Sequence, residues 1–139
     1  RAARESGAFS YRNARVCDEN GEVLGMILAY RQPDPYDTSD IDEYPEFLRP
    51  LVVLEALAPG SWYVNAIATY AGHRGKGVAR SLLADTEERA RAAGCGQLSL
   101  IVAGENASAK LLYEYLGYEV VGQAVVAPEL TTWGFFRPD

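Results

Sequence analysis

The stretch Ala71–Leu83, AGHRGKGVARSLL, places glycines and three basic residues directly before a helical pattern. Helix N-termini carry unpaired amides and a partial positive charge, so a phosphate group binds there favourably. Gly75 and Gly77 lack the Cβ atoms that would hold a phosphate away from those amides. The stretch therefore indicates either an anion site or a strand-to-helix turn that needs glycine only for its geometry.

Two known phosphate-binding motifs do not fit this loop. A P-loop requires glycine five positions ahead of Gly75, where Tyr70 stands, and serine or threonine after Lys76, where Gly77 stands. The dinucleotide fingerprint requires its last glycine at the position of Arg80. Both classes are excluded by the sequence.

The bulk composition restricts the class of protein further. The net charge of -6 and the pI of about 4.8 argue against a nucleic-acid partner, whose binding surface would be broadly basic. No segment approaches the roughly 18 apolar residues of a membrane-spanning helix, so no membrane partner is expected. His73 is the one histidine, and Cys17 and Cys95 are isolated, which predicts no metal site and no disulfide framework. We expect a reduced, cytoplasmic protein with a single domain over residues 1–139.

The elements that must position the loop alternate between strands and helices. Two strand-like segments, FSYRNARV and EVLGMILAY, are joined by CDENGE, in which Asn20-Gly21 is a strong hairpin signal. The later elements are a short helix from Pro50 to Pro59-Gly60, a strand SWYVNAIAT, a helix from about Arg74 to Ala93, a strand QLSLIVA, a helix ASAKLLYEYL after Asn106, and the antiparallel pair YEVVGQAVV and LTTWGFF. This order predicts a mixed α/β (α+β) sheet with one parallel strand–helix–strand unit that crosses over right-handed.

One family pattern does match the loop. The spacing Arg/Gln-x-x-Gly-x-Gly/Ala is filled by Arg74, Gly77 and Ala79, and it resembles the acyl-CoA-binding signature of the GNAT superfamily of acetyl-CoA-dependent N-acetyltransferases. The resemblance runs in register from about Ser61 to Gly122 and includes the helix that ends Leu-Tyr-x-x-Leu-Gly-Tyr. It implies a GNAT-like, mostly antiparallel central sheet flanked by helices. Nothing matches the family's usual first strand and first helices, so we expect the domain to lack them.

The resemblance implies acetyl-CoA as the co-substrate, with its pyrophosphate on the loop amides and its pantetheine arm along the preceding strand. An amide of that strand would also face the thioester oxygen, where negative charge develops during amine attack. The cofactor-binding residues implied are Ala66, Ile67, Ala68, Thr69, Arg74, Gly75, Lys76, Gly77, Val78, Ala79, Arg80, Asn106 and Tyr113.

Tyr113 occupies the position of the family tyrosine that protonates the departing CoA thiolate. A phenol with a pKa of ~10 is a suitable acid for a thiol leaving group of pKa ~8.5. Asn106 precedes it by seven residues, about two turns, on the same helix face, where the family often binds pantetheine. The alternatives are a buried aromatic residue for Tyr113 and a plain helix cap for Asn106.

The general base is harder to assign. An alkylammonium group of pKa ~10 must lose a proton before it attacks, but the strand SWYVNAIAT contains no acid. Asn65 could hold a water that relays the proton, and Glu55 on the preceding short helix is the nearest carboxylate in sequence. A solvated helix residue is the alternative role for Glu55.

An acidic insert lies before the short helix. Asp34 to Glu46 contains six acids and no base, which either favours a cationic acceptor or forms a solvated loop. The function implied is an N-acetyltransferase that moves an acetyl group from acetyl-CoA to a small-molecule or peptide primary amine by direct attack in a ternary complex. Two alternatives stay open, namely a non-catalytic acyl-CoA-binding sensor and an acyltransferase that uses a longer acyl-CoA. A homodimer is expected by analogy with the family.

Overall fold

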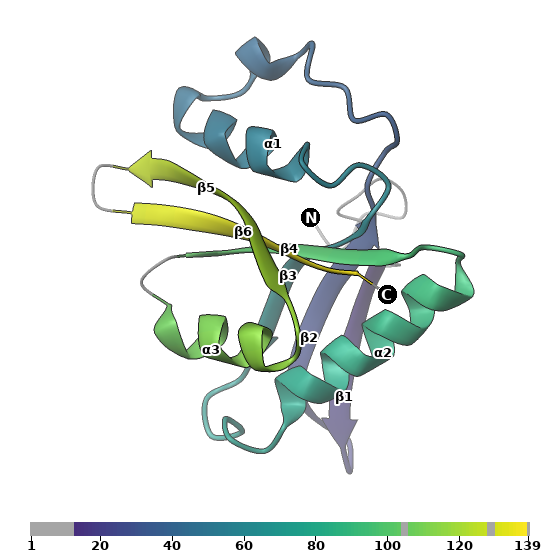
Figure 1. Ribbon diagram of the computed structural model, residues 1–139. Helices are drawn as coiled ribbons and strands as arrows, with labels where there is room; N and C mark the ends of the chain where they lie inside the picture. Colours follow the sequence, from purple (N-terminus) through teal and green to yellow (C-terminus); the bar gives the residue numbers. More distant parts are fainter. Residues whose placement is uncertain (1–12, 104–105, 128–129, 139) are drawn as a thin grey trace.

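The computed structural model describes residues 13–103, 106–127 and 130–138. Six strands form one sheet in the order β1-β2-β3-β4-β6-β5 (Figure 1). The strands are β1 (Ala14–Glu19), β2 (Glu22–Arg31), β3 (Trp62–Thr69), β4 (Gln97–Ala103), β5 (Glu119–Ala127) and β6 (Leu130–Pro138). The helices are α1 (Arg49–Glu55), α2 (Val78–Ala92) and α3 (Ala107–Tyr115), with 3₁₀ turns η2 (Ile41–Glu43) and η3 (Glu46–Leu48) in the acidic insert.

The pairing of the strands confirms the predicted fold class. β3 and β4 are parallel and are connected through α2, whereas all other neighbouring strands are antiparallel. Helix α1 packs against β5, β6 and β4, and α2 packs against β1, β2, β3 and β4. Figure 1 shows α1 on the opposite side of the sheet from α2 and α3.

The first hairpin forms at the predicted turn, since Asn20 and Gly21 adopt positive φ values of 53° and 85°. Its strands are longer at this end than the sequence pattern indicated. Cys17 pairs with Gly25 and Glu19 pairs with Glu22, so Cys17–Glu19 belongs to the ladder and not to the connection. The beginning of FSYRNARV lies outside the described residues.

Helix α2 begins at Val78, later than the predicted start near Arg74. Gly75 and Gly77 have φ values of 81° and 77°, which an α-helix does not accommodate, so the segment before Val78 is a loop. The buried face of α2 consists of Val78, Leu82, Leu83, Thr86 and Ala90, at helical spacing. Together with apolar residues of β2, β3, β4 and α3, this face forms the main core. None of the helices in the described part of the chain has the length and apolar character needed to cross a membrane.

Gly25 of β2 is a site of close backbone approach. A Cβ atom added there would lie 2.6 Å from the Ala68 carbonyl oxygen and 2.8 Å from Val78 Cγ1. The Gly25→Ala change is therefore expected to lower the free energy of unfolding by about 1–3 kcal/mol, as overpacking does. Urea denaturation would measure this loss. The matched control is Gly96→Ala, because an added Cβ at Gly96 meets nothing within 4 Å; equal effects of the two changes would contradict the prediction.

Candidate active site

The strands β3 and β4 separate part of the way along their length. Their parallel pairing consists of Trp62 with Leu98, Tyr63 with Ser99 and Val64 with Leu100. Strand β3 continues to Thr69 and pairs there with Gly25 of β2 on its other edge. Among the described residues, no residue of β3 after Val64 pairs with β4. The β4-facing edge of β3 beyond Val64 is therefore accessible to an extended ligand.

A β-bulge lies at the point of separation. Ala29 of β2 pairs with Val64, and its neighbour Leu28 pairs with Ala66, so Asn65 is the extra residue in β3. Bulges bend a strand and redirect its side chains, and they occur frequently beside active sites. Nothing in the sequence SWYVNAIAT signals a bulge, because it contains neither glycine nor proline.

An open pocket of ≈ 900 Å³ lies between the end of β3, the glycine loop, α2 and α3. Its walls are Ile67–Thr69 from β3, Arg74, Gly75 and Gly77 from the loop, Val78–Arg80 from α2, and Asn106, Ser108, Ala109, Leu112 and Tyr113 from the α3 segment. The structure thus brings together most of the cofactor-binding residues expected from the sequence. It adds three residues of α3 that share a helical face with Asn106 and Tyr113, which helical spacing alone could have identified.

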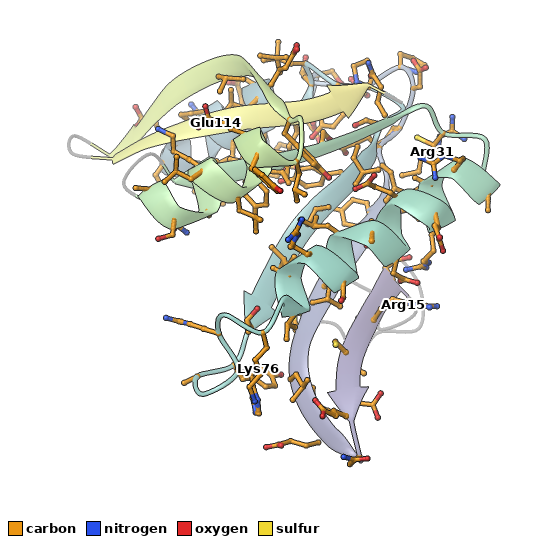
Figure 2. All side chains as sticks on the ribbon, turned by 60° about the horizontal axis from the view of Figure 1, so that its bottom comes forward. Arg15, Arg31, Lys76 and Glu114 are labelled. Atoms are coloured by element: carbon orange, nitrogen blue, oxygen red, sulfur yellow. The ribbon has the colours of Figure 1, made fainter. Side chains whose placement is uncertain are left out.

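Two expected residues do not line the pocket, namely Ala66 and Lys76. The Lys76 Nζ atom lies 3.3 Å from His73 Nδ1, and His73 Nε2 lies 3.3 Å from Glu22 Oε2 of the first hairpin. Figure 2 labels Lys76 on the loop that precedes α2. These contacts anchor the glycine loop to the β1–β2 turn.

The loop has the features that a phosphate requires. Gly75 and Gly77 have positive φ, and a Cβ atom added at either residue would meet no protein atom within 4 Å. Arg74 and Arg80 contribute positive charge to the pocket wall, and the Arg80 guanidinium lies 5.4 Å from the centre of the Tyr115 ring. A pyrophosphate therefore fits at the N-terminus of α2, with the open edge of β3 beside it.

Tyr113 is buried in the α3 wall, and its ring centre lies 5.8 Å from that of Tyr118. Burial raises the pKa of the Tyr113 phenol, so its hydroxyl carries a proton at neutral pH. Asn106 caps α3 as expected, because its Oδ1 accepts a hydrogen bond from the Ala109 amide at 3.3 Å. Both residues also border the pocket, so a cap role for Asn106 does not exclude a ligand role.

The two candidates for the general base do not line the pocket. Asn65 Nδ2 donates to the Tyr30 hydroxyl at 3.1 Å, and the Tyr36 hydroxyl donates to Glu55 Oε1 at 2.7 Å. The Tyr30 and Tyr63 rings pack edge to face at 5.8 Å. Glu55 is therefore not a freely solvated helix residue, but one member of a polar cluster.

The tyrosines in and near the pocket predict that alkali lowers the stability of the folded protein. Burial is the main cause that raises the pKa of Tyr30, Tyr36, Tyr63 and Tyr113, and the Glu55 charge adds to the rise for the first three. The unfolded phenols ionise near pH ~10, whereas the folded ones keep their protons to higher pH, so ionisation favours the unfolded state. The contribution is fully present below about pH 10 and is lost as the pH rises through the folded pKa values.

We therefore expect the urea midpoint to fall between about pH 10 and pH 12, with a smaller fall for Tyr63→Phe. Tyrosinate absorbance, recorded in the same titration, would assign the transition to phenol ionisation. A midpoint that stays constant over this range in the wild-type protein would contradict the expectation.

Comparison with known proteins identifies the class. The profile of the acetyltransferase (GNAT) family matches residues 3–118, whereas no curated protein shows a significant sequence match. An agmatine N-acetyltransferase superposes with a TM-score of 0.77 at 15% identity, over 95% of this chain and 77% of that one. A Drosophila melanogaster polyamine N-acetyltransferase that forms N-acetylagmatine gives a TM-score of 0.75 at 16% identity, over 93% and 76%. A chain of the NatC complex bound to Gag peptide and CoA gives a TM-score of 0.63 at 18% identity, over 89% of this chain and 68% of that one.

The fold, the glycine loop and the family profile thus agree on an acetyltransferase. The chain belongs to the GNAT family.

Proposed function

We propose that the protein transfers an acetyl group from acetyl-CoA to a primary amine by direct attack in a ternary complex. The observation that carries this proposal is the pocket where β3 leaves β4, because its walls hold the glycine loop, the α2 N-terminus and Tyr113 together. Acetyl-CoA supplies the activated thioester. The chain supplies anion binding at Gly75 and Gly77–Arg80 and an extended backbone edge at Ile67–Thr69.

Each proposed catalytic residue has one role. Tyr113 donates its phenolic proton to the sulfur that departs when the amine nitrogen bonds to the carbonyl carbon. Asn65, at the bulge, holds a water that relays a proton from the attacking nitrogen to the solvent. A backbone amide of β3 stabilises the negative charge that develops on the carbonyl oxygen. No covalent bond to the enzyme is needed, because both substrates are bound together.

The first experiment is a calorimetric titration of the purified chain with acetyl-CoA and, for comparison, with adenosine bisphosphate. We expect one-to-one binding of acetyl-CoA that is tighter than that of the bisphosphate, because the pantetheine arm adds contacts along β3. Release of free thiol in the presence of primary amines, including agmatine and polyamines, would then measure transfer.

Binding without turnover of any amine would favour the non-catalytic sensor. A higher kcat/KM with propionyl- or succinyl-CoA would favour transfer of a longer acyl group. Absence of binding by the folded protein would overturn the proposal. The cytoplasmic location and the homodimer stay predictions.

A further inference from the structure

A cluster of tyrosines surrounds a single carboxylate beside the active site. We define the tyrosine cage as Glu55 with Tyr30, Tyr36, Tyr44 and Tyr63. The Tyr36 hydroxyl donates to Glu55 Oε1 at 2.7 Å, and the Tyr30 and Tyr63 rings pack together at 5.8 Å. Burial is the main cause that raises the pKa values of Tyr30, Tyr36 and Tyr63; Glu55 adds to the rise for all three, and Tyr44 adds a smaller rise for Tyr30 and Tyr36.

Among the described residues, the charge at the centre of the cage has no cationic partner. Glu55 is half-buried, and the part of the chain that the structure describes places no Lys, Arg or His nitrogen within 4.0 Å of its carboxylate. A half-buried anion that is hydrogen-bonded only by neutral phenols is costly to maintain, and a ligand cation would offset that cost. Tyrosine faces also attract cations. Tyr44 is 39% exposed, so this member of the cage lies at the protein surface.

The cage lies on the face of the sheet that carries α1. Val64 packs into the core under α2, and neighbouring strand residues point to opposite faces, so Tyr63 points to the face that carries α1. Tyr63 precedes Asn65 by two residues, which places it about 7 Å further from the pocket along the strand. Asn65 links the two regions through its hydrogen bond to Tyr30. A group held in the cage is therefore displaced from the open β3 edge where transfer is proposed.

We propose that the tyrosine cage binds a cationic group of the acceptor other than the amine that reacts. The acceptor is then a compact dication, namely a diamine or an aminoalkyl guanidine, whose second charge rests on Glu55. This inference rests on the proposed function and narrows its substrate class. The acidic insert supports the cage directly, because Tyr36 and Tyr44 both belong to it. The exposed acids around them would attract a dication electrostatically.

The test compares putrescine with butylamine, which have the same carbon chain and differ by one cationic group. We expect the wild-type protein to favour putrescine in kcat/KM by roughly 10- to 100-fold, the effect of one charged hydrogen bond. The Glu55→Gln change keeps an acceptor oxygen for Tyr36 and removes only the charge. It should reduce the preference to about twofold, the factor that remains because putrescine has two reactive amines and butylamine has one. The change should appear mainly as a higher KM for putrescine, and KM for acetyl-CoA should be unchanged.

The control is Glu46→Gln, which removes the same charge from an exposed position at the end of the acidic insert and should retain the preference. A purely structural role for the cage would lower the unfolding temperature of Glu55→Gln without changing the ratio of the two amines. If Glu55→Gln does not fold, Tyr44→Ala at the exposed rim should reduce the preference several-fold.

The outcomes separate the two proposals. If a folded Glu55→Gln variant keeps the wild-type preference for putrescine, the proposed role of the cage is wrong. An equal loss of kcat/KM for both amines would also contradict it, because that result would place Glu55 at the reacting nitrogen. If the wild-type protein acetylates neither amine, the proposed function fails for these acceptors. Calorimetry with putrescine, on the wild-type protein and on Glu55→Gln, then tests cation binding by the cage independently of transfer. Weaker binding to the variant supports cation binding by the cage, and equal or absent binding overturns it.

Discussion

Replacing Tyr113 by phenylalanine is expected to lower kcat for amine acetylation about 100-fold, the usual size of a general-acid contribution. The ring and its packing against Tyr118 remain, so the unfolding temperature and the affinity for acetyl-CoA should stay close to their wild-type values. Steady-state release of free thiol would measure kcat, and calorimetry would measure acetyl-CoA affinity. The raised pKa of Tyr113 also predicts that the wild-type rate does not decline at pH values where a free phenol begins to ionise.

The matched control for this change is Tyr115→Phe, which removes a hydroxyl from the same helix at a residue that does not line the pocket. Its ring can still pack under the Arg80 guanidinium, so kcat should be unchanged. An equal kcat for wild type and Tyr113→Phe, at saturating acetyl-CoA, would show that the leaving thiolate is protonated by another group.

Replacing Gly77 by alanine is expected to weaken acetyl-CoA binding by about 10- to 100-fold. The added methyl group would stand where α2 presents its first amides to a phosphate, and displacement of the phosphate would cost at least one charged hydrogen bond. The change also places alanine at φ 77°, which costs about 1 kcal/mol of stability by itself. Calorimetric titration with CoA and a urea denaturation curve would separate the two effects.

Gly72→Ala provides the comparison. Gly72 also has positive φ, at 90°, and an added Cβ there meets no atom within 4 Å, but the residue does not line the pocket. It should lose a similar amount of stability and no CoA affinity. If both variants lose affinity equally, the loop conformation would be the important feature, and the contact of phosphate with the α2 amides would not.

The sequence predicted the parts of the fold that depend on local chemistry. The Asn20-Gly21 turn, the cap at Asn106, the end of α2 before Gly94 and the parallel unit β3–α2–β4 all follow from the conformational preferences of a few residues. The resemblance to the family also identifies most residues of the pocket wall.

The start of α2 and the surroundings of Glu55 could not be predicted in the same way. A helical pattern continues backward through Arg74, but the left-handed glycines decide where the first helical residue lies. The bulge at Asn65 results from the register between β2 and β3, which is a tertiary property. Tyr36 and Glu55 are 19 residues apart and meet only because the insert folds back over the sheet.

The separation of β3 from β4 has a mechanical consequence. The sheet consists of two halves, β1-β2-β3 and β4-β6-β5, and their shared ladder extends only from Trp62 to Val64. This ladder is the shortest between neighbouring strands in the described sheet, and an extended ligand would lie beside it along β3. A ligand that binds only the folded state shifts the folding equilibrium towards that state. CoA bound along β3, as proposed, would therefore stabilise the association of the two halves of the sheet. If CoA binds as proposed, it would therefore slow proteolysis of the protein in addition to serving as a substrate.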